Sequence, residues 1–282
     1  MKTERLTNNR FGIFLLLSLL TARGFADDLA EKGRAVFKQY RHTVVTISIV
    51  LKSKISVGGM GGQSNESRQE VTGTVLDPSG LIVLSLSATD PGQMMQTFLG
   101  GMDGMDGEDT KLKMETELSD LKVLLDDGTE VPAEVVLRDK DLDLAYIKPK
   151  NKLSTPMEAL DFSKSGKVEL LDQIIALNRL GNTAGRAYAA SIDRISAVVE
   201  RPRLFYVPAS GMTSATLGAP AFSLDGKPLG IFVMRTIKSH GGGMGMFSLQ
   251  PDNLTTVIVP AQDILKGAKQ VPAAEEEKKK EK

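Results

Sequence analysis

Short runs of β-branched and apolar residues alternate with turn sequences along most of the chain. The first such run covers residues 43–51. Residues 71–76 and 81–86 form two more runs, and they flank Asp77-Pro78-Ser79-Gly80. This tetrapeptide suits a type I turn because proline stands second and glycine fourth. The pattern therefore predicts a β-hairpin over residues 71–86.

The same texture continues almost to the end of the chain. Asp126-Asp127-Gly128 separates two runs at residues 121–125 and 131–137, which predicts a second hairpin. Further apolar runs lie at residues 144–147, 173–177, 187–199, 204–207, 221–224, 229–234 and 256–259. Many short strands at this spacing are typical of small antiparallel β-barrels.

Helical spacing of apolar residues occurs only near the two ends of this region, at residues 27–40 and 262–269. Residues 149–166 contain Pro149, Pro156 and Gly166, and they predict a link between two lobes. The expected fold is all-β, with two six-stranded antiparallel barrels and short terminal helices. The expected organisation is an N-terminal helix over residues 27–42, a first barrel over 43–150, a second barrel with its closing helix over 151–270, and a charged disordered tail over 271–282.

The first 26 residues have the pattern of a secretory signal peptide. Basic residues precede an apolar run over residues 11–20, and Gly24-Phe25-Ala26 is a small-x-small cleavage sequence. The apolar run is shorter than the ~20 residues that a spanning helix needs. We therefore expect an exported protein, periplasmic or extracellular, with residues 1–26 removed and no integral membrane span.

Composition narrows the chemistry further. The chain of 282 residues has no cysteine and two histidines, His42 and His240, which excludes disulfides and thiol nucleophiles. Lysine plus arginine and aspartate plus glutamate balance at 35 each; loss of the signal peptide removes four basic residues and one acidic residue, leaving a net charge of −3. Such a balance gives no electrostatic footprint for nucleic acid. No cofactor or metal ligand set is expected from these residues.

Glycine- and methionine-rich stretches interrupt the strands at residues 58–62, 100–107 and 241–246. The sequence predicts loops there, with residues 52–69, 90–117 and 238–248 as the connecting segments. Thioethers are soft ligands that suit Cu(I), so a methionine-rich copper-binding protein is one alternative function. The simpler interpretation is that these loops make adaptable apolar contacts.

Three segments resemble the catalytic motifs of HtrA-type trypsin-like serine proteases. Residues 72–89 match the family's first hairpin and the strand before the catalytic histidine, and they place Ser87 at the histidine position. Residues 139–148 match the acidic segment and place Asp143 at the triad aspartate. Residues 215–231 match the nucleophile loop and place Leu217 at the nucleophile position. The order of these motifs is the trypsin-like one, and no PDZ-like region follows them.

The resemblance implies a protease fold whose chemistry is incomplete. In such enzymes a serine hydroxyl attacks the carbonyl, an imidazole takes its proton and an aspartate orients the imidazole. Leu217 has no hydroxyl, and Ser87 cannot replace the base. The backbone N–H groups of Ala215 and Leu217 occupy the oxyanion-hole positions. Alanine replaces the family's glycine at Ala215 and Ala219, which would strain the loop if either position needs a positive φ.

The function that this pattern favours is an inactive pseudoprotease that binds unfolded or extended polypeptide or acts as a scaffold. A homo-oligomer or a partner protease would be compatible with such a role. Loss of the nucleophile leaves a cleft that can still accept an extended peptide by strand addition. The alternative within the same fold is a serine endopeptidase with non-standard catalytic residues, in which Ser210 or Ser214 acts as a shifted nucleophile.

Overall fold

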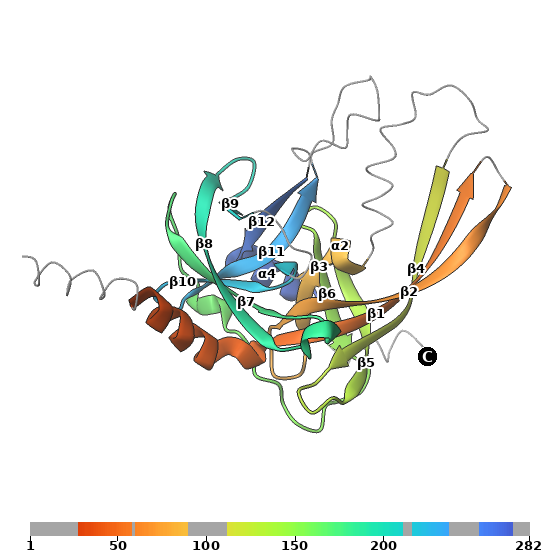
Figure 1. Ribbon diagram of the computed structural model, residues 1–282, viewed down its shortest axis with the longest axis horizontal. Helices are drawn as coiled ribbons and strands as arrows, with labels where there is room; N and C mark the ends of the chain where they lie inside the picture. Colours follow the sequence, from red (N-terminus) through yellow and green to blue (C-terminus); the bar gives the residue numbers. More distant parts are fainter. Residues whose placement is uncertain (1–27, 58–59, 90–111, 211–215, 237–253, 273–282) are drawn as a thin grey trace, which may run out of the picture.

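Two closed β-barrels make up the fold in the computed structural model, which describes residues 28–57, 60–89, 112–210, 216–236 and 254–272 (Figure 1). The strand order is β1-β2-β3-β6-β5-β4 in the first barrel and β10-β11-β12-β9-β8-β7 in the second. All the paired strands are antiparallel. The predicted double six-stranded barrel is confirmed.

Each barrel is built from consecutive strands. The first contains β1 (Val44–Val57), β2 (Met60–Val75), β3 (Ile82–Ser85), β4 (Leu112–Leu124), β5 (Glu130–Asp139) and β6 (Leu144–Pro149). The second contains β7 (Gln173–Arg179), β8 (Tyr188–Val199), β9 (Phe205–Pro208), β10 (Pro220–Ser223), β11 (Pro228–Thr236) and β12 (Leu254–Pro260).

Helices are short and lie mainly at the ends of the described chain. They cover residues 28–40, η1 (Arg41–Thr43), α2 (Leu86–Thr89), η4 (Phe162–Lys164), η5 (Asn182–Ala184) and α4 (Ala261–Ala268). The N-terminal helix contacts the second barrel through Tyr40, whose ring stacks on Phe222 with centroids 4.9 Å apart. Helix α4 packs close to the first barrel, where the Tyr146 hydroxyl donates to the Ile264 carbonyl at 2.8 Å.

Three clusters of buried apolar side chains hold this arrangement together. One fills the first barrel and includes Ile47 and Leu84; another fills the second and includes Ile174 and Ile258. The third contains Tyr146 with residues from both barrels, the N-terminal helix and α4. Burial of apolar surface is the dominant favourable term in folding, so the third cluster joins the two barrels into one unit.

The predicted loop boundaries in the first barrel are wrong. Residues 52–57 and 60–69 are strand rather than connection, and residues 112–117 already belong to β4. These strands were not predicted because they contain many polar residues and lack an apolar alternation. Lys52, for example, lies opposite Glu66 of β2 and opposite Glu117 of β4. Opposite charges across neighbouring strands stabilise a sheet whose residues lack apolar alternation.

Several sequence predictions concern residues outside the described part of the chain. They are the signal peptide over residues 1–26, most of the tail over 271–282, and the methionine-glycine stretches around residues 100–107 and 241–246. Within the described ranges, no helix is long and apolar enough to cross a membrane.

Candidate functional site

Asp143 lies in the turn between β5 and β6, at the junction of the two barrels. Its backbone adopts a left-handed conformation with φ 56°, which is uncommon for a residue other than glycine. Its carboxylate accepts hydrogen bonds from the Ser85 hydroxyl, from the Ser87 hydroxyl at 2.6 Å and from the Ser87 backbone N–H at 2.7 Å. A fourth donor, the backbone N–H of Met234 at 3.1 Å, comes from β11 of the second barrel. Asp143, the predicted triad aspartate, therefore joins the two barrels.

Burial raises the pKa of Asp143 above its ordinary value, because a carboxylate inside the protein loses its hydration. The hydrogen bonds from Ser85, Ser87 and Met234 act in the opposite direction, since each stabilises the charged form. Desolvation is the larger effect. A perturbed carboxylate at this position is compatible with a catalytic ancestry, but structural carboxylates are perturbed in the same way.

Ser87 lies in the short helix α2, which begins directly after β3. Helix α2 is anchored at its start because the Leu86 N–H donates to the Asp143 carbonyl at 2.9 Å. The structure thus brings Ser87 and Asp143 into direct contact, as the sequence alignment predicts for a histidine and its aspartate. The hydroxyl of Ser87 is used as a donor to the carboxylate, and it offers no basic nitrogen to a substrate.

Leu217 lies in the loop before β10 and is buried, with 5% of its surface exposed. The neighbouring Gly218 fixes this loop against the first barrel. Its carbonyl accepts from the Thr74 hydroxyl at 2.8 Å, and its φ is +83°. A Cβ on Gly218 would lie 2.1 Å from the Thr72 carbonyl oxygen and 3.3 Å from Leu84 Cα. Only glycine fits there, so the loop that carries Leu217 packs beside the strand that leads to Ser85 and Ser87.

The structure tests the prediction for only one of the two alanines of this loop. Ala215 lies outside the described residues, so the oxyanion-hole position assigned to its N–H stays a prediction. Ala219 is completely buried, and it is not among the residues with positive φ. The strain considered for a non-glycine residue at position 219 is therefore absent.

A cavity of about 350 Å³ opens beside the loop that carries Leu217. Thr216 and Ser210 contribute to it from that region, and Phe232 and Thr256 contribute from β11 and β12. The Thr256 hydroxyl is buried without a hydrogen-bond partner. Two of the wall residues on β8 are Ala189 and Ala190, whose small side chains leave the space open. The cavity is large enough for a side chain of a bound peptide.

Ser210, the alternative nucleophile, lines this cavity but has no imidazole beside it in the described part of the chain. Its backbone N–H donates to the Asp193 carboxylate at 3.1 Å. His42 binds Tyr188, which is five residues before Asp193 on β8. In an extended strand these two positions are roughly 16 Å apart, so His42 lies far from Ser210. Ser214 and His240 lie outside the described residues.

His42 is part of a polar cluster that sequence reasoning missed. Its Nδ1 atom lies 2.9 Å from an Asp126 carboxylate oxygen, and its Nε2 atom accepts from Arg41 Nε at 3.0 Å. Asp126 also accepts from Arg179 at 2.8 Å and from the Tyr188 hydroxyl at 2.5 Å. Partial burial alone would raise the pKa of Asp126, but these hydrogen bonds lower it overall. No motif in the sequence links these residues, because their contact depends on how the barrels pack.

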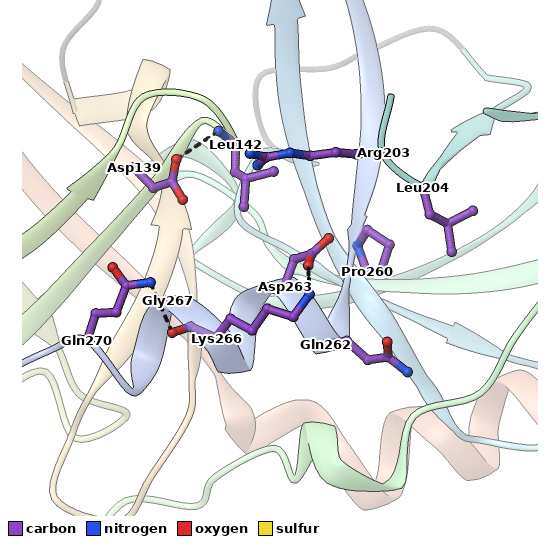
Figure 2. A pocket seen from close by; sticks show the side chains of 10 residues that line it. All are labelled: Asp139, Leu142, Arg203, Leu204, Pro260, Gln262, Asp263, Lys266, Gly267 and Gln270. Atoms are coloured by element: carbon purple, nitrogen blue, oxygen red, sulfur yellow. Dashed lines mark hydrogen bonds and ion pairs between the residues drawn. The ribbon is translucent and has the colours of Figure 1, made fainter. Parts of the chain in front are cut away.

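A larger cavity, of about 550 Å³, is lined by neither Ser87 nor Leu217; Figure 2 shows its lining residues. Helix α4 forms one side, and the turn after β5 and the segment before β9 form the other. Its charged residues have both signs: Asp139 and Asp263 are acidic, whereas Arg203 and Lys266 are basic. Lys266 pairs with Asp263 at 2.8 Å. Because it contains no residue of the former triad, we do not assign it to the candidate site.

Metal binding gains no support from the described residues, which contain no group of three or more histidine, cysteine, aspartate or glutamate side chains that could hold an ion. The structure does not test the alternative of copper binding by methionine. Met94, Met95, Met102, Met105, Met244 and Met246 lie outside the described residues, and the side chain of Met60 is not described.

Comparisons with known proteins agree with this geometry. Residues 104–231 match the trypsin-like peptidase domain family, a range that includes Asp143 and Leu217 and begins after Ser87. The chain is 28% identical over 142 residues to the putative protease Do-like 14 of Arabidopsis thaliana; this match covers 48% of the chain but only 32% of that relative.

Among solved structures, the MamO protease domain of Magnetospirillum magneticum in its apo form is 13% identical and has a TM-score of 0.49, covering 82% of this chain and 97% of that one. The chain thus has a trypsin-like double-barrel fold of the HtrA type, and residues 104–231 are similar to the trypsin-like peptidase domain family.

Proposed function

We propose that this protein is an exported pseudoprotease that binds extended polypeptide in the cleft between its barrels without cleaving it. The observation that carries the proposal is the hydrogen-bonded pairing of Ser87 with Asp143, together with the burial of Leu217. The aspartate is saturated by hydrogen bonds, the base position holds a hydroxyl donor, and the nucleophile position holds an apolar side chain. Loss of the base and nucleophile together costs on the order of a million-fold in turnover in a well-studied serine protease.

The retained cavity supports the binding half of the proposal. It adjoins the loop that positions a substrate in active proteases of this fold, and its walls include Phe232 and two alanines. Pockets that accept a single side chain give specificity, while the main chain of an extended peptide supplies hydrogen bonds. We therefore assign this cavity to an apolar side chain of the bound segment.

Hydrolysis assays test the catalytic half. The purified protein should not cleave unfolded casein, and a fluorophosphonate probe should not label it. Labelling that disappears in Ser210→Ala or Ser214→Ala would establish a shifted nucleophile and would overturn the assignment as a pseudoprotease.

Peptide binding tests the other half. Fluorescence anisotropy with a labelled, unfolded casein fragment should show saturable binding, and Ala190→Trp should weaken it by roughly tenfold or more because an indole fills the cavity. Val199→Trp is the matched control, since Val199 is exposed on the same strand and does not line the cavity. Equal binding by both variants would show that the cavity does not take part in peptide binding. Absence of binding by the unmodified protein would refute the proposal.

A further inference from the structure

The first barrel carries an extension formed by three of its strands. β2 pairs with β3 only at Thr74 and Val75, and β4 pairs with β5 only at residues 122–124. β1, in contrast, pairs with β2 from Val44 and with β4 from Thr46, in both cases out to its end at Val57. The three strands therefore continue together beyond the barrel as an arm with β1 in the centre (Figure 1).

This arrangement leaves one side of β2 as a sheet edge. Over residues 64–70, no strand in the described part of the chain pairs with the side of β2 that faces away from β1. At the inner end of this segment the Gln69 side chain donates to the Ala88 carbonyl of α2, and Glu70 pairs with Arg186. The side chains of residues 64–68 are all exposed. Unpaired N–H and C=O groups on such an edge form a template for another strand.

The charges along this edge are self-complementary. Glu66 and Arg68 point to the same side of the sheet because they are two residues apart in a strand. Within the described ranges no ion pair within 4 Å involves either residue, although Lys52 of β1 lies opposite Glu66 and the charge of Arg68 acts on Glu130. The Cα partner of Arg68 on β1 is the apolar Val50. An exposed acidic residue and an exposed basic residue thus lie next to each other on the edge, on either side of Ser67.

We propose that two copies of this chain associate through their β2 edges, antiparallel and about a two-fold axis at Ser67. In this register Glu66 of each copy lies opposite Arg68 of the other, and Ser64 lies opposite Glu70. No like charges face each other between residues 64 and 70. The paired arms form one continuous sheet in the order β4-β1-β2-β2-β1-β4, and the contact is isologous as a two-fold dimer requires.

The association is independent of peptide binding in the cleft, and it is modest in strength. Two paired edges of this length bury less surface than a standard stable interface, so a dissociation constant on the order of micromolar or weaker is expected. Four exposed charges contribute to it, and salt screens such charges. Sedimentation velocity of the full chain over a concentration series should therefore show a dimer that weakens as the salt concentration rises.

A charge swap tests the register. Arg68→Glu places four carboxylates around the axis and should raise the dissociation constant by about tenfold or more. The double variant Glu66→Arg/Arg68→Glu restores opposite charges and should recover the dimer. Lys152→Glu, which makes the same change of charge at an exposed position outside the arm, should leave the dimer unchanged.

A single cysteine tests the axis directly, because the chain has none of its own. Cα atoms that face each other across antiparallel strands lie within the range that a disulfide spans. Mild oxidation should therefore convert Ser67→Cys into a covalent dimer. Ser53→Cys, on the central strand of the same arm, should remain monomeric in that assay.

Three results would overturn the proposal. The protein could be a monomer at every concentration, or its dimerisation constant could be the same in Arg68→Glu as in the unmodified protein. The third result is a dimer that is weakened by Glu115→Lys on β4 but not by Arg68→Glu. The last result would place the contact on the opposite edge of the arm. None of these results bears on proteolysis or peptide binding, so the two proposals fail separately.

Discussion

Ser87 binds Asp143 twice, through its hydroxyl at 2.6 Å and through its backbone N–H at 2.7 Å. A histidine at this position would use the same carboxylate to hold its ring. Here the carboxylate instead fixes the start of α2, and its remaining capacity goes to Ser85 and to Met234 of the second barrel. Asp143, which the sequence motifs predict to be the triad aspartate, therefore has a structural role in this protein.

This role predicts a measurable coupling between the two residues. Ser87→Ala removes one hydrogen bond to a charged group and should lower the free energy of unfolding by about 1–2 kcal/mol. Asp143→Ala leaves the partly buried N–H donors of Ser87 and Met234 without an acceptor and should cost more, about 3 kcal/mol. Urea unfolding of both single variants and the double variant checks this. The double variant should lose less than the sum of the two, and strict additivity would contradict a direct interaction.

Asp143 also predicts a pH dependence of stability. Burial raises its pKa in the folded protein. Between the ordinary value, about 3.9, and the raised value, the folded protein binds more protons at this site than the unfolded chain does. The contribution of Asp143 to the free energy of unfolding is therefore fully present below the ordinary pKa and falls as pH rises through the raised pKa.

Asp143→Asn provides the measurement, because asparagine does not titrate. The difference in unfolding free energy between the native protein and this variant should grow in favour of the native protein as pH is lowered from 7 to 4. A difference that stays constant over this range would contradict a raised pKa at Asp143.

Local sequence patterns were enough to predict most of the strands and turns. The features that they did not predict depend on contacts between residues far apart in the sequence. The Asp77-Pro78-Ser79-Gly80 turn was predictable because its chemistry is contained in four residues; Gly80 has φ +93°, and its N–H donates to the Asp77 carbonyl. The arm was not predictable from periodicity, because both of its faces include polar residues. The alignment of motifs predicted that Ser87 and Asp143 lie together. The polar cluster of His42 and Asp126 was not predicted, because it depends on how the two barrels pack against each other.

Rebuilding the triad should not restore an efficient protease. Ser87→His/Leu217→Ser supplies a base and a hydroxyl, but the loop around Leu217 packs a buried apolar side chain in its present shape. A displacement of about 1 Å of the nucleophile costs on the order of 100-fold in rate. Casein hydrolysis and fluorophosphonate labelling should show turnover at least about 100-fold below that of an intact protease. Rapid hydrolysis by the double variant would show that the loop is already correctly shaped.

The last prediction concerns Gly218, which positions the loop that carries Leu217. Gly218→Ala should lower the free energy of unfolding by about 3 kcal/mol or more, because the new Cβ would have to avoid the Thr72 carbonyl oxygen only 2.1 Å away. Gly128→Ala is the matched control. Gly128 has a similar φ of +85° but no atom within 4 Å of the added Cβ, so its cost should be limited to the backbone conformation, about 1–2 kcal/mol. Thermal and urea unfolding of the two variants measure the difference. Equal losses would mean that the loop moves away from β2 freely, and the cleft would then lack the fixed wall that the proposed peptide binding requires.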